Sequence, residues 1–295
     1  MDIYIVVGVA GSGKSSYIKN NKSKNSLVLS SDEIRKELFD KLSQENNQLV
    51  FETMNKRLIA AVKENSFDEV YYDATNLSRK RRIGLYKNIK SLDKNANVAI
   101  LLFLVPLNVI LKQNAQRTGD AVVPEYSIKR MYKNLQIPKS GVDCNNFKIV
   151  TNYTIDDFKN EFEVEDIPHD SSYHKETVQE HIDLTIKNAE ATNDKELVQV
   201  AKFHDLGKFV AKEFVNDEHT IARFTGHENI SSMYWLVNCK DNLNDENLGI
   251  AEVIFHHMNA HKGLSDKYIE KHKINDKELK LINEFAKIDD LSRRV

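Results

Sequence analysis

The feature that most constrains this chain is the segment Gly8–Ser15, GVAGSGKS, which directly follows the apolar run Ile3–Val7. The pattern G-x-x-x-x-G-K-[ST] between a strand and a helix is typical of a loop that wraps phosphate groups. Its backbone N–H groups turn toward phosphate oxygens, and the following helix adds the positive end of its dipole. Lys14 should reach the β- and γ-phosphates, and Ser15 should bind Mg²⁺. The residues expected to hold the nucleoside triphosphate in this loop are Gly8, Gly11, Ser12, Gly13, Lys14, Ser15 and Ser16.

Strand and helix patterns alternate over the first half of the chain. Short apolar runs predict strands at residues 3–7, 27–29, 70–73, 98–104 and 147–150, with helical segments between them. One of these segments, residues 44–65, has Leu49, Met54, Leu58 and Val62 as candidate core positions. The alternation predicts an α/β domain over residues 1–155, with a parallel sheet and helices on both faces.

Two carboxylates follow predicted strands of this domain. Asp32 comes after the second strand and lies three residues before Arg35, on the same helical face. Asp32 or Ser31 could simply cap the following helix, but a carboxylate there also lies where a phosphoryl acceptor would bind. Asp73 ends the third strand and is positioned to hold Mg²⁺ through water.

Basic residues recur near the expected nucleotide site. The run Arg79–Arg82 is either a solvated helix face or a binding site for a polyanionic acceptor. Arg117 and Arg130 flank the loop 118–124, where a lid over the phosphates would lie. Arginines in a lid neutralise the charge that develops on a transferred phosphoryl group.

The second half of the chain has a different pattern. An acidic stretch at residues 156–170 is a candidate linker, and helical periodicity dominates residues 171–295. Histidines and aspartates recur along these helices, and their imidazoles and carboxylates could converge on one or two divalent cations. The candidate ligands are His181, His204, Asp205, His227, His256 or His257, and Asp289. For His174, His219, His261 and His272 we favour surface or hydrogen-bonded core positions.

Bulk properties exclude several classes of protein. A formal net charge of −2 over 295 residues argues against a broadly basic coat for nucleic acid. The two cysteines, Cys144 and Cys239, have no metal-binding spacing and indicate a reducing compartment. The N-terminus leads directly into a core strand, and the longest apolar run is too short to span a bilayer. These features favour a cytoplasmic protein with no membrane partner.

Residues 1 to about 150 resemble the polynucleotide 5′-kinase branch of P-loop phosphotransferases. The resemblance rests on GVAGSGKSS, SSDEIRKEL, YDATN and the lid segment QRTGDAVVPEYSIKRM. It implies ATP and Mg²⁺ as cofactors, with Lys14 and Ser15 on the phosphates. It also implies that Asp32 is the base for an acceptor 5′-OH, that Arg35 holds the acceptor's phosphate, and that Arg117 acts from the lid.

Residues 170–295 resemble the HD superfamily of metal-dependent phosphohydrolases, most closely the HD domain of bacterial tRNA nucleotidyltransferases. The resemblance rests on the segments EH (180–181), FHDLGK (203–208), TGHE (225–228), FHHM (255–258) and KIDD (287–290). This resemblance implies an all-α HD domain with His181, His204, Asp205 and Asp289 as ligands. It implies that His227 and either His256 or His257 complete a second metal site. The metal would be Mn²⁺, Ni²⁺, Co²⁺, Fe²⁺ or Zn²⁺ rather than Mg²⁺.

Together the two resemblances imply a bifunctional enzyme that heals broken RNA (or DNA) ends. It would phosphorylate 5′-OH ends and open 2′,3′-cyclic phosphates, with an RNA ligase acting downstream. Two alternatives remain at this stage. One is a nucleotide or small-molecule kinase with a nucleotide-hydrolysing HD domain, and the other is an ATPase regulated by a ligand-binding HD module.

Overall fold

The computed structural model describes residues 1–40, 46–162, 164–171 and 174–294. The chain divides into two compact units, Met1–Asn152 and Tyr153–Val295. The boundary differs from the expected one because the predicted linker 156–170 overlaps a short helix, α7 (Ile155–Lys159). Thr154 and Asp157 cap this helix, and its Phe158 packs edge to face against Tyr234 of the second unit. The first residues of the predicted linker therefore belong to helix α7 of the second unit.

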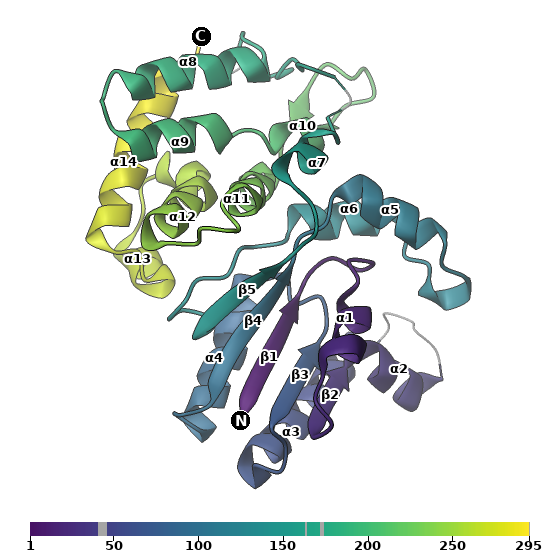
Figure 1. Cartoon of the computed structure of the whole chain (residues 1–295). Coiled ribbons are helices and arrows are strands. Elements are labelled where there is room, and N and C mark those ends of the chain that lie inside the picture. Colours follow the sequence, from purple (N-terminus) through teal and green to yellow (C-terminus); the bar gives the residue numbers. More distant parts are fainter. Residues whose placement is uncertain (41–45, 163, 172–173, 295) are drawn as a thin grey trace. The chain divides into compact units, whose positions relative to one another are not determined.

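The first unit is built on a five-stranded parallel sheet (Figure 1). Its strands are β1 (Asp2–Val7), β2 (Ser26–Ser30), β3 (Glu69–Asp73), β4 (Asn97–Phe103) and β5 (Asn146–Val150). Their order across the sheet is β2-β3-β1-β4-β5. All five predicted strands are present, and the predicted fold class is confirmed.

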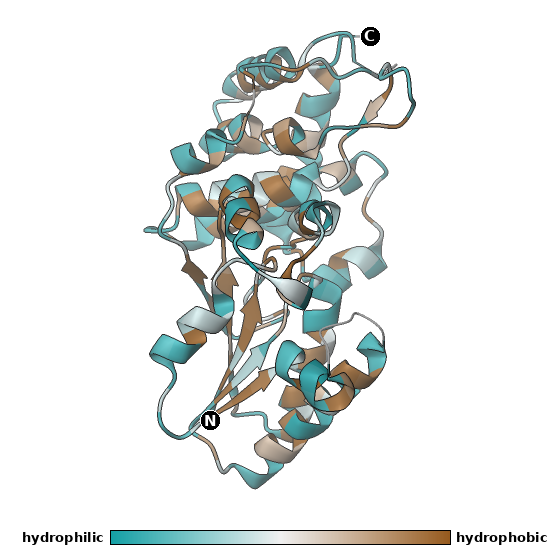
Figure 2. Cartoon of the chain, turned by 90° about the vertical axis from the view of Figure 1, so that its right-hand side faces the viewer, coloured by the Kyte–Doolittle hydropathy of each residue, from teal (hydrophilic) through white to brown (hydrophobic). Residues whose placement is uncertain are grey.

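Helices cover both faces of this sheet. They are α1 (Lys14–Asn21), α2 (Ser31–Phe39), α3 (Asn47–Glu64), α4 (Arg79–Leu92), α5 (Leu107–Ala115) and α6 (Glu125–Lys133). Val6 and Tyr71 pack with Ile18 of α1 on one face. Tyr72, whose side chain points to the opposite face, donates a hydrogen bond to Asn55 of α3. Neighbouring residues on both sides of these strands are therefore buried, and much of the sheet is brown in Figure 2.

Two local expectations for the first unit need correction. Helix α2 is capped by the side chain of Ser30, which accepts a hydrogen bond from the Glu33 amide, and not by Ser31 or Asp32. Leu49 is 43% exposed, whereas Met54, Leu58 and Val62 are buried as expected. Leu49 lies about 140° around the helix from Met54, whereas Val50, Met54 and Leu58 share one buried face. The predicted start of this helix at residue 44 lies outside the described residues.

The second unit is predominantly helical. Its longer helices are α8 (Val178–Glu190), α9 (Lys195–Phe203), α11 (His227–Asn238), α12 (Asp245–Ala260) and α14 (Asp276–Leu291), with the short helices α10 (Lys208–Ala211) and α13 (Asp266–His272). The sequence did not predict its small antiparallel hairpin, β6 (Glu213–Phe214) with β7 (Ala222–Arg223). Strands of two residues are too short to produce an alternating pattern.

Within the described ranges, no helix has both the length and the apolar character needed to cross a membrane.

Candidate functional site

The phosphate-binding loop lies at the carboxyl end of β1. Val6 pairs with Asp73 of β3, and Asp73 pairs with Ser30 of β2, so three strand ends are aligned there. Gly13 caps α1 with φ = 83°, a backbone conformation that residues with a Cβ rarely adopt. Ser15 and Ser16 are exposed in the first turn of α1, where free backbone N–H groups can meet phosphate oxygens.

Lys14 is buried against its own loop. Its Nζ donates hydrogen bonds to the carbonyl oxygens of Gly8 at 3.1 Å and Val9 at 2.8 Å. Burial lowers its pKa to about 8, although the nearby carboxylates of Asp73 and Asp32 oppose the shift. A bound triphosphate would supply stronger acceptors than these two carbonyls. Lys14 is therefore held next to the place where phosphates would bind.

Asp73 is linked to the magnesium-binding residue expected from the sequence. The Ser15 hydroxyl donates a hydrogen bond to Asp73 Oδ2 at 3.0 Å. Burial raises the pKa of Asp73, while the ammonium group of Lys14 opposes this change. The hydroxyl and the carboxylate therefore form a pair of oxygen ligands suited to Mg²⁺.

Asp32 and Arg35 form an ion pair on α2. Arg35 Nη1 lies 2.9 Å from Asp32 Oδ1, and Arg35 Nη2 lies 2.6 Å from Asn47 Oδ1. The Arg35 side chain is 5% exposed and that of Asp32 is 67% exposed. The arginine therefore fixes the direction of a carboxylate that remains accessible. Because Ser30 caps the helix, Asp32 is not needed for capping.

The two lid arginines differ in their surroundings. Arg117 follows α5, and its Nη1 donates to the carbonyl of Ala121 at 3.2 Å. Its Nη2 lies 3.8 Å from the position that a Cβ on Gly11 would occupy, so it lies beside the phosphate-binding loop. Arg130 is exposed on α6. Among the predicted lid residues, Arg117 is the one that the structure brings to the nucleotide site.

The basic run Arg79–Arg82 is mostly structural. Arg79 and Arg82 are each 1% exposed, so neither predicted reading fits them. Arg82 Nε lies 2.8 Å from Asp143 Oδ2, and its other nitrogens donate to backbone carbonyls. This buried pair ties the start of α4 to the segment before β5. Only Lys80 and Arg81 are exposed to solvent.

In the second unit, the predicted ligands come from separate elements. His181 lies on α8, His204 and Asp205 follow α9, His227 begins α11, His257 lies on α12 and Asp289 lies on α14. Gly207 permits this convergence, because a Cβ at its position would lie 2.2 Å from the carbonyl oxygen of His227. The turn after α9 can therefore approach the start of α11 only with glycine at this position.

These side chains form two buried groups that meet at Asp205. One group contains His181, His204 and Asp289, and the other contains Asp205, His227 and His257. Asp205 Oδ2 lies 3.4 Å from His204 Nε2 and 3.6 Å from His181 Nε2. Asp205 Oδ1 lies 3.2 Å from His227 Nε2 and 3.8 Å from His257 Nε2. One carboxylate oxygen therefore faces each group.

The orientation of the histidines fits a divalent cation. The Nδ1 atoms of His204, His227 and His257 lie 2.6–2.9 Å from the carbonyl oxygens of Ala201, Phe224 and Ile254. A carbonyl only accepts, so each Nδ1 carries the proton and each Nε2 of a neutral ring offers a lone pair. His227 Nε2 and His257 Nε2 are 3.2 Å apart, and His204 Nε2 and His181 Nε2 are 3.4 Å apart. Facing lone pairs at these distances repel each other unless a cation or a proton lies between them.

Protons compete with a cation at this site. Burial disfavours the charged form of His204, but Asp205 and Asp289 outweigh it and raise its pKa. Burial lowers the pKa of His257 to about 3, so this ring stays neutral and available as a ligand.

The structure also separates His256 from His257. His257 faces Asp205, whereas His256 Nδ1 lies 2.8 Å from the hydroxyl of Tyr268 on α13. His256 Nε2 lies 3.3 Å from Glu252 Oε2, one helical turn earlier. Neighbouring residues on a helix point about 100° apart, so only one of them can reach the centre. Of the two candidates, His257 is the one brought to the other ligands.

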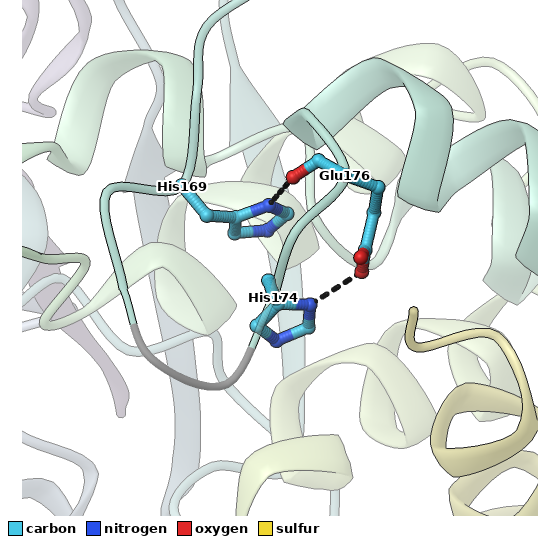
Figure 3. Close-up of side chains that lie close together, drawn as sticks. All are labelled: His169, His174 and Glu176. Atoms are coloured by element: carbon cyan, nitrogen blue, oxygen red, sulfur yellow. Dashed lines mark hydrogen bonds and ion pairs between the residues drawn. The ribbon is translucent and has the colours of Figure 1, made fainter. Parts of the chain in front are cut away.

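A cavity of about 510 Å³ adjoins this centre and includes His227 in its wall. Its wall also includes His169, His174, Lys208 and Arg293, to which sequence reasoning assigned no role at this site. Lys208 Nζ lies 2.6 Å from Asp205 Oδ2 and 3.1 Å from His169 Nε2. The spacing of Lys208, three residues after Asp205, was a signal available in the sequence. His169 and His174 lie in irregular chain and carry no such pattern (Figure 3).

Comparison with known proteins characterises the first unit. A family model described as an AAA domain matches residues 3–138. With the phosphate-binding loop and the parallel sheet, this match identifies the N-terminal unit as a P-loop kinase-like domain, and such a domain implies ATP and Mg²⁺. No curated protein matches the chain.

Solved structures share only weak similarity with the chain. A chain of the Pnkp1/Rnl/Hen1 RNA repair complex has 19% identity and a TM-score of 0.38, covering 45% of this chain and 43% of that one. A second structure of the Pnkp1/Rnl/Hen1 complex has 22% identity and a TM-score of 0.31, covering 38% of each chain. An unliganded sugar kinase from Janibacter sp. HTCC2649 has 16% identity and a TM-score of 0.34, covering 51% of this chain and 84% of that one. This chain spans less than half of the two repair-complex chains, and such likenesses indicate no particular activity.

Proposed function

We propose that this chain is a bifunctional enzyme that heals broken RNA ends. The first unit would transfer the γ-phosphoryl group of ATP to a 5′-OH end. The second unit would hydrolyse a 2′,3′-cyclic phosphate and then the resulting monoester. The arrangement that carries this proposal is the placement of Asp205, with one carboxylate oxygen facing each of two groups of candidate metal ligands.

In the first unit, Asp32 is the proposed general base. Its carboxylate is accessible and is oriented by Arg35, which suits a group that must accept a proton from an acceptor hydroxyl. Lys14 and Arg117 would neutralise charge on the transferred phosphoryl group. Ser15 and Asp73 would hold Mg²⁺, which would neutralise further negative charge on the phosphates. Arg35 is buried and paired with Asp32. An acceptor phosphate would therefore contact its guanidinium group only where this ion pair meets solvent.

In the second unit, we assign His181, His204 and Asp289 to one metal ion and His227 and His257 to another, with Asp205 shared. Mixed imidazole and carboxylate ligands favour a transition metal such as Mn²⁺, Ni²⁺, Co²⁺, Fe²⁺ or Zn²⁺ over Mg²⁺. Two such ions would activate a water molecule and stabilise the leaving oxygen. The hydrogen bonds from Nδ1 to backbone carbonyls keep the imidazoles in the tautomer that binds metal.

RNA connects the two proposed activities. Cleavage of RNA through attack by its 2′-hydroxyl leaves a 5′-OH on one fragment and a 2′,3′-cyclic phosphate on the other. A kinase and a phosphohydrolase in one chain would convert both ends into substrates for an RNA ligase, and the expected compartment is the cytoplasm. DNA ends would be served only by the kinase and monoesterase activities, since DNA has no 2′-hydroxyl.

The test uses purified protein, ATP, Mg²⁺ and Mn²⁺ with a short RNA that carries both ends. Separation of the products should reveal a new 5′-phosphate and the loss of the cyclic phosphate. Phosphorylation of free nucleosides in preference to RNA would instead identify a small-molecule kinase. ATP hydrolysis without any phosphorylated acceptor, and with an intact cyclic phosphate, would identify an ATPase with a ligand-binding second unit.

A further inference from the structure

The segment that precedes α8 folds back on itself beside the candidate metal centre. Pro168 and Thr177 form an isolated antiparallel bridge, and the Val178 amide donates to the Ile167 carbonyl at 2.9 Å. This closure brings His169 opposite Glu176, so that His169 Nδ1 donates to the Glu176 carbonyl at 2.8 Å. His169, His174 and Glu176 consequently form a third group of potential ligands (Figure 3).

Three features argue against a metal ion in this third group. The rings of His169 and His174 are stacked, with centroids 4.1 Å apart and planes 13° from parallel. Lone pairs lie in the ring plane, so two stacked rings cannot both point at one ion about 2 Å away. Moreover, Nδ1 of His169 already donates to a carbonyl, and its Nε2 lies 3.1 Å from the ammonium group of Lys208. A metal ion there would have to displace a cation.

His174 is nevertheless held in a defined orientation. Its Nδ1 lies 2.6 Å from Glu176 Oε1, and the Glu176 side chain is fully buried. An ionised carboxylate only accepts, so Nδ1 carries the proton. In the neutral ring, Nε2 is then a hydrogen-bond acceptor. No hydrogen bond to Nε2 is formed within the part of the chain that the structure describes, and the side chain is 14% exposed and lines the cavity.

Glu176 also connects His174 to the candidate centre. Its Oε1 lies 3.4 Å from Nδ1 of His181, and its Oε2 accepts from the Arg294 amide at 3.0 Å. The rings of His174 and His181 are 5.1 Å apart. The ring of His174 therefore lies next to a proposed metal ligand, and the side chain lines a cavity whose wall includes the aromatic ring of Phe224.

We propose that His174 is a specificity-determining residue that accepts a hydrogen bond from the ribose hydroxyl next to the scissile phosphate. The partner of an acceptor nitrogen is a donor, and phosphate oxygens that lack a proton do not donate. The donor that lies beside the phosphate of a ribonucleotide 2′- or 3′-monoester is the neighbouring free hydroxyl. A cyclic phosphate has both oxygens esterified and offers no such donor. The inference rests on the proposed function of the second unit and assigns it a preference for ribose monoesters.

The test compares adenosine 3′-monophosphate with 2′-deoxyadenosine 3′-monophosphate, using protein loaded with Mn²⁺. One hydrogen bond between neutral groups contributes about 0.5–1.5 kcal/mol, so the wild type should favour the ribose compound by about 2- to 12-fold in kcat/KM. His174→Ala should remove this preference by lowering the ribose value alone. His174→Gln, whose amide oxygen can accept a hydrogen bond, should retain part of it. His219→Ala, which alters an exposed histidine of the β6–β7 hairpin, is the matched control.

Two further measurements separate the possible failures. Elemental analysis of His174→Ala should give the metal content of the wild type, and the loss of an equivalent would overturn the inference in favour of a third metal site. Equal losses on both nucleotides would also overturn it, because they indicate only a structural role. If the wild type hydrolyses neither compound, the proposed function fails. Calorimetric binding of the same two nucleotides then tests the role of His174 separately. A ribose preference that His174→Ala abolishes would then support the inference, and the absence of any preference would refute it.

Discussion

Asp32 is the residue on which the proposed kinase chemistry depends most. Asp32→Ala should reduce the phosphorylation rate by roughly 10²–10⁴-fold, because a positioned general base contributes about that much. The affinity for ATP should change little. Since Ser30 caps α2, thermal unfolding should also change little. Glu33→Ala removes the neighbouring exposed carboxylate and is the control. Full activity of Asp32→Asn would rule out the base assignment.

Lys14 should make nucleotide binding dependent on pH. Its pKa is lowered to about 8 by burial, so the free protein loses this positive charge as the pH rises through that value. Bound phosphates favour the charged form, which means that binding is strongest below the pKa and weakens above it. The Kd for ATP should rise by up to about tenfold per pH unit above that point. Lys14→Arg keeps its charge, so its Kd should stay flat over the same range, and an equally flat wild-type curve would contradict the account.

His256 and His257 allow a comparison between adjacent residues. His257→Ala should reduce the amount of bound metal, because its Nε2 faces Asp205 and His227. His256→Ala should leave the metal content unchanged and should lower the free energy of unfolding by about 1–3 kcal/mol, since Tyr268 and Glu252 lose a buried partner. Elemental analysis combined with denaturant unfolding checks both. Loss of metal from His256→Ala but not from His257→Ala would mean that His256, and not His257, is the metal ligand.

At the scale of secondary structure elements, the turn between α9 and α10 controls the candidate centre. Gly207→Ala would place a Cβ 2.2 Å from the His227 carbonyl oxygen, so the turn and the start of α11 must separate. We expect a lower melting temperature and a loss of bound metal. Gly249→Ala, on α12, meets no atom within 4 Å and should stabilise the protein by about 0.4–1 kcal/mol. A Gly207→Ala protein with normal stability and metal content would show that the close approach is not required.

The elements of the first unit could be predicted from sequence because their signals are local. The phosphate-binding loop is one contiguous segment, and the strands of a parallel sheet are continuous apolar runs. Leu49 was assigned wrongly because it lies about 140° around the helix from Met54, off the face that Val50, Met54 and Leu58 bury. Arg79 and Arg82 were also missed, because only the fold brings Asp143 and the carbonyls near them.

The centre of the second unit could be predicted only in part. The proposed ligands are distributed between His181 and Asp289, so their proximity follows from the packing of five helices and not from spacing. His256 and His257 could not be separated, since both belong to the same apolar helix. Glu176 and His174 were not anticipated as a pair, because they lie in irregular chain, where the bridge between Pro168 and Thr177 leaves no periodic signal.

At the scale of the whole molecule, the two proposed activities should be separable. Lys14 and Asp205 belong to different compact units, each with its own core. Lys14→Ala should abolish phosphoryl transfer and leave ester hydrolysis near the wild-type rate. Asp205→Asn should have the opposite effect. Both ends of the same RNA would be assayed with each variant, after circular dichroism has established that it is folded. Loss of both activities from either substitution would indicate a single composite site.

The metal content of the protein, purified without chelator, shows whether Asp205 joins two metal sites. Because Asp205 presents one oxygen to each group of ligands, we predict two equivalents of a transition metal per chain. Binding needs neutral imidazoles. Because the pKa of His204 is raised whereas that of His257 is lowered to about 3, the ion at the His181, His204 and Asp289 group should be lost first as the pH falls. One equivalent of metal per chain would contradict the proposal that two metal ions share Asp205. No metal, with hydrolysis that survives in chelator, would contradict the metal-dependent mechanism as a whole.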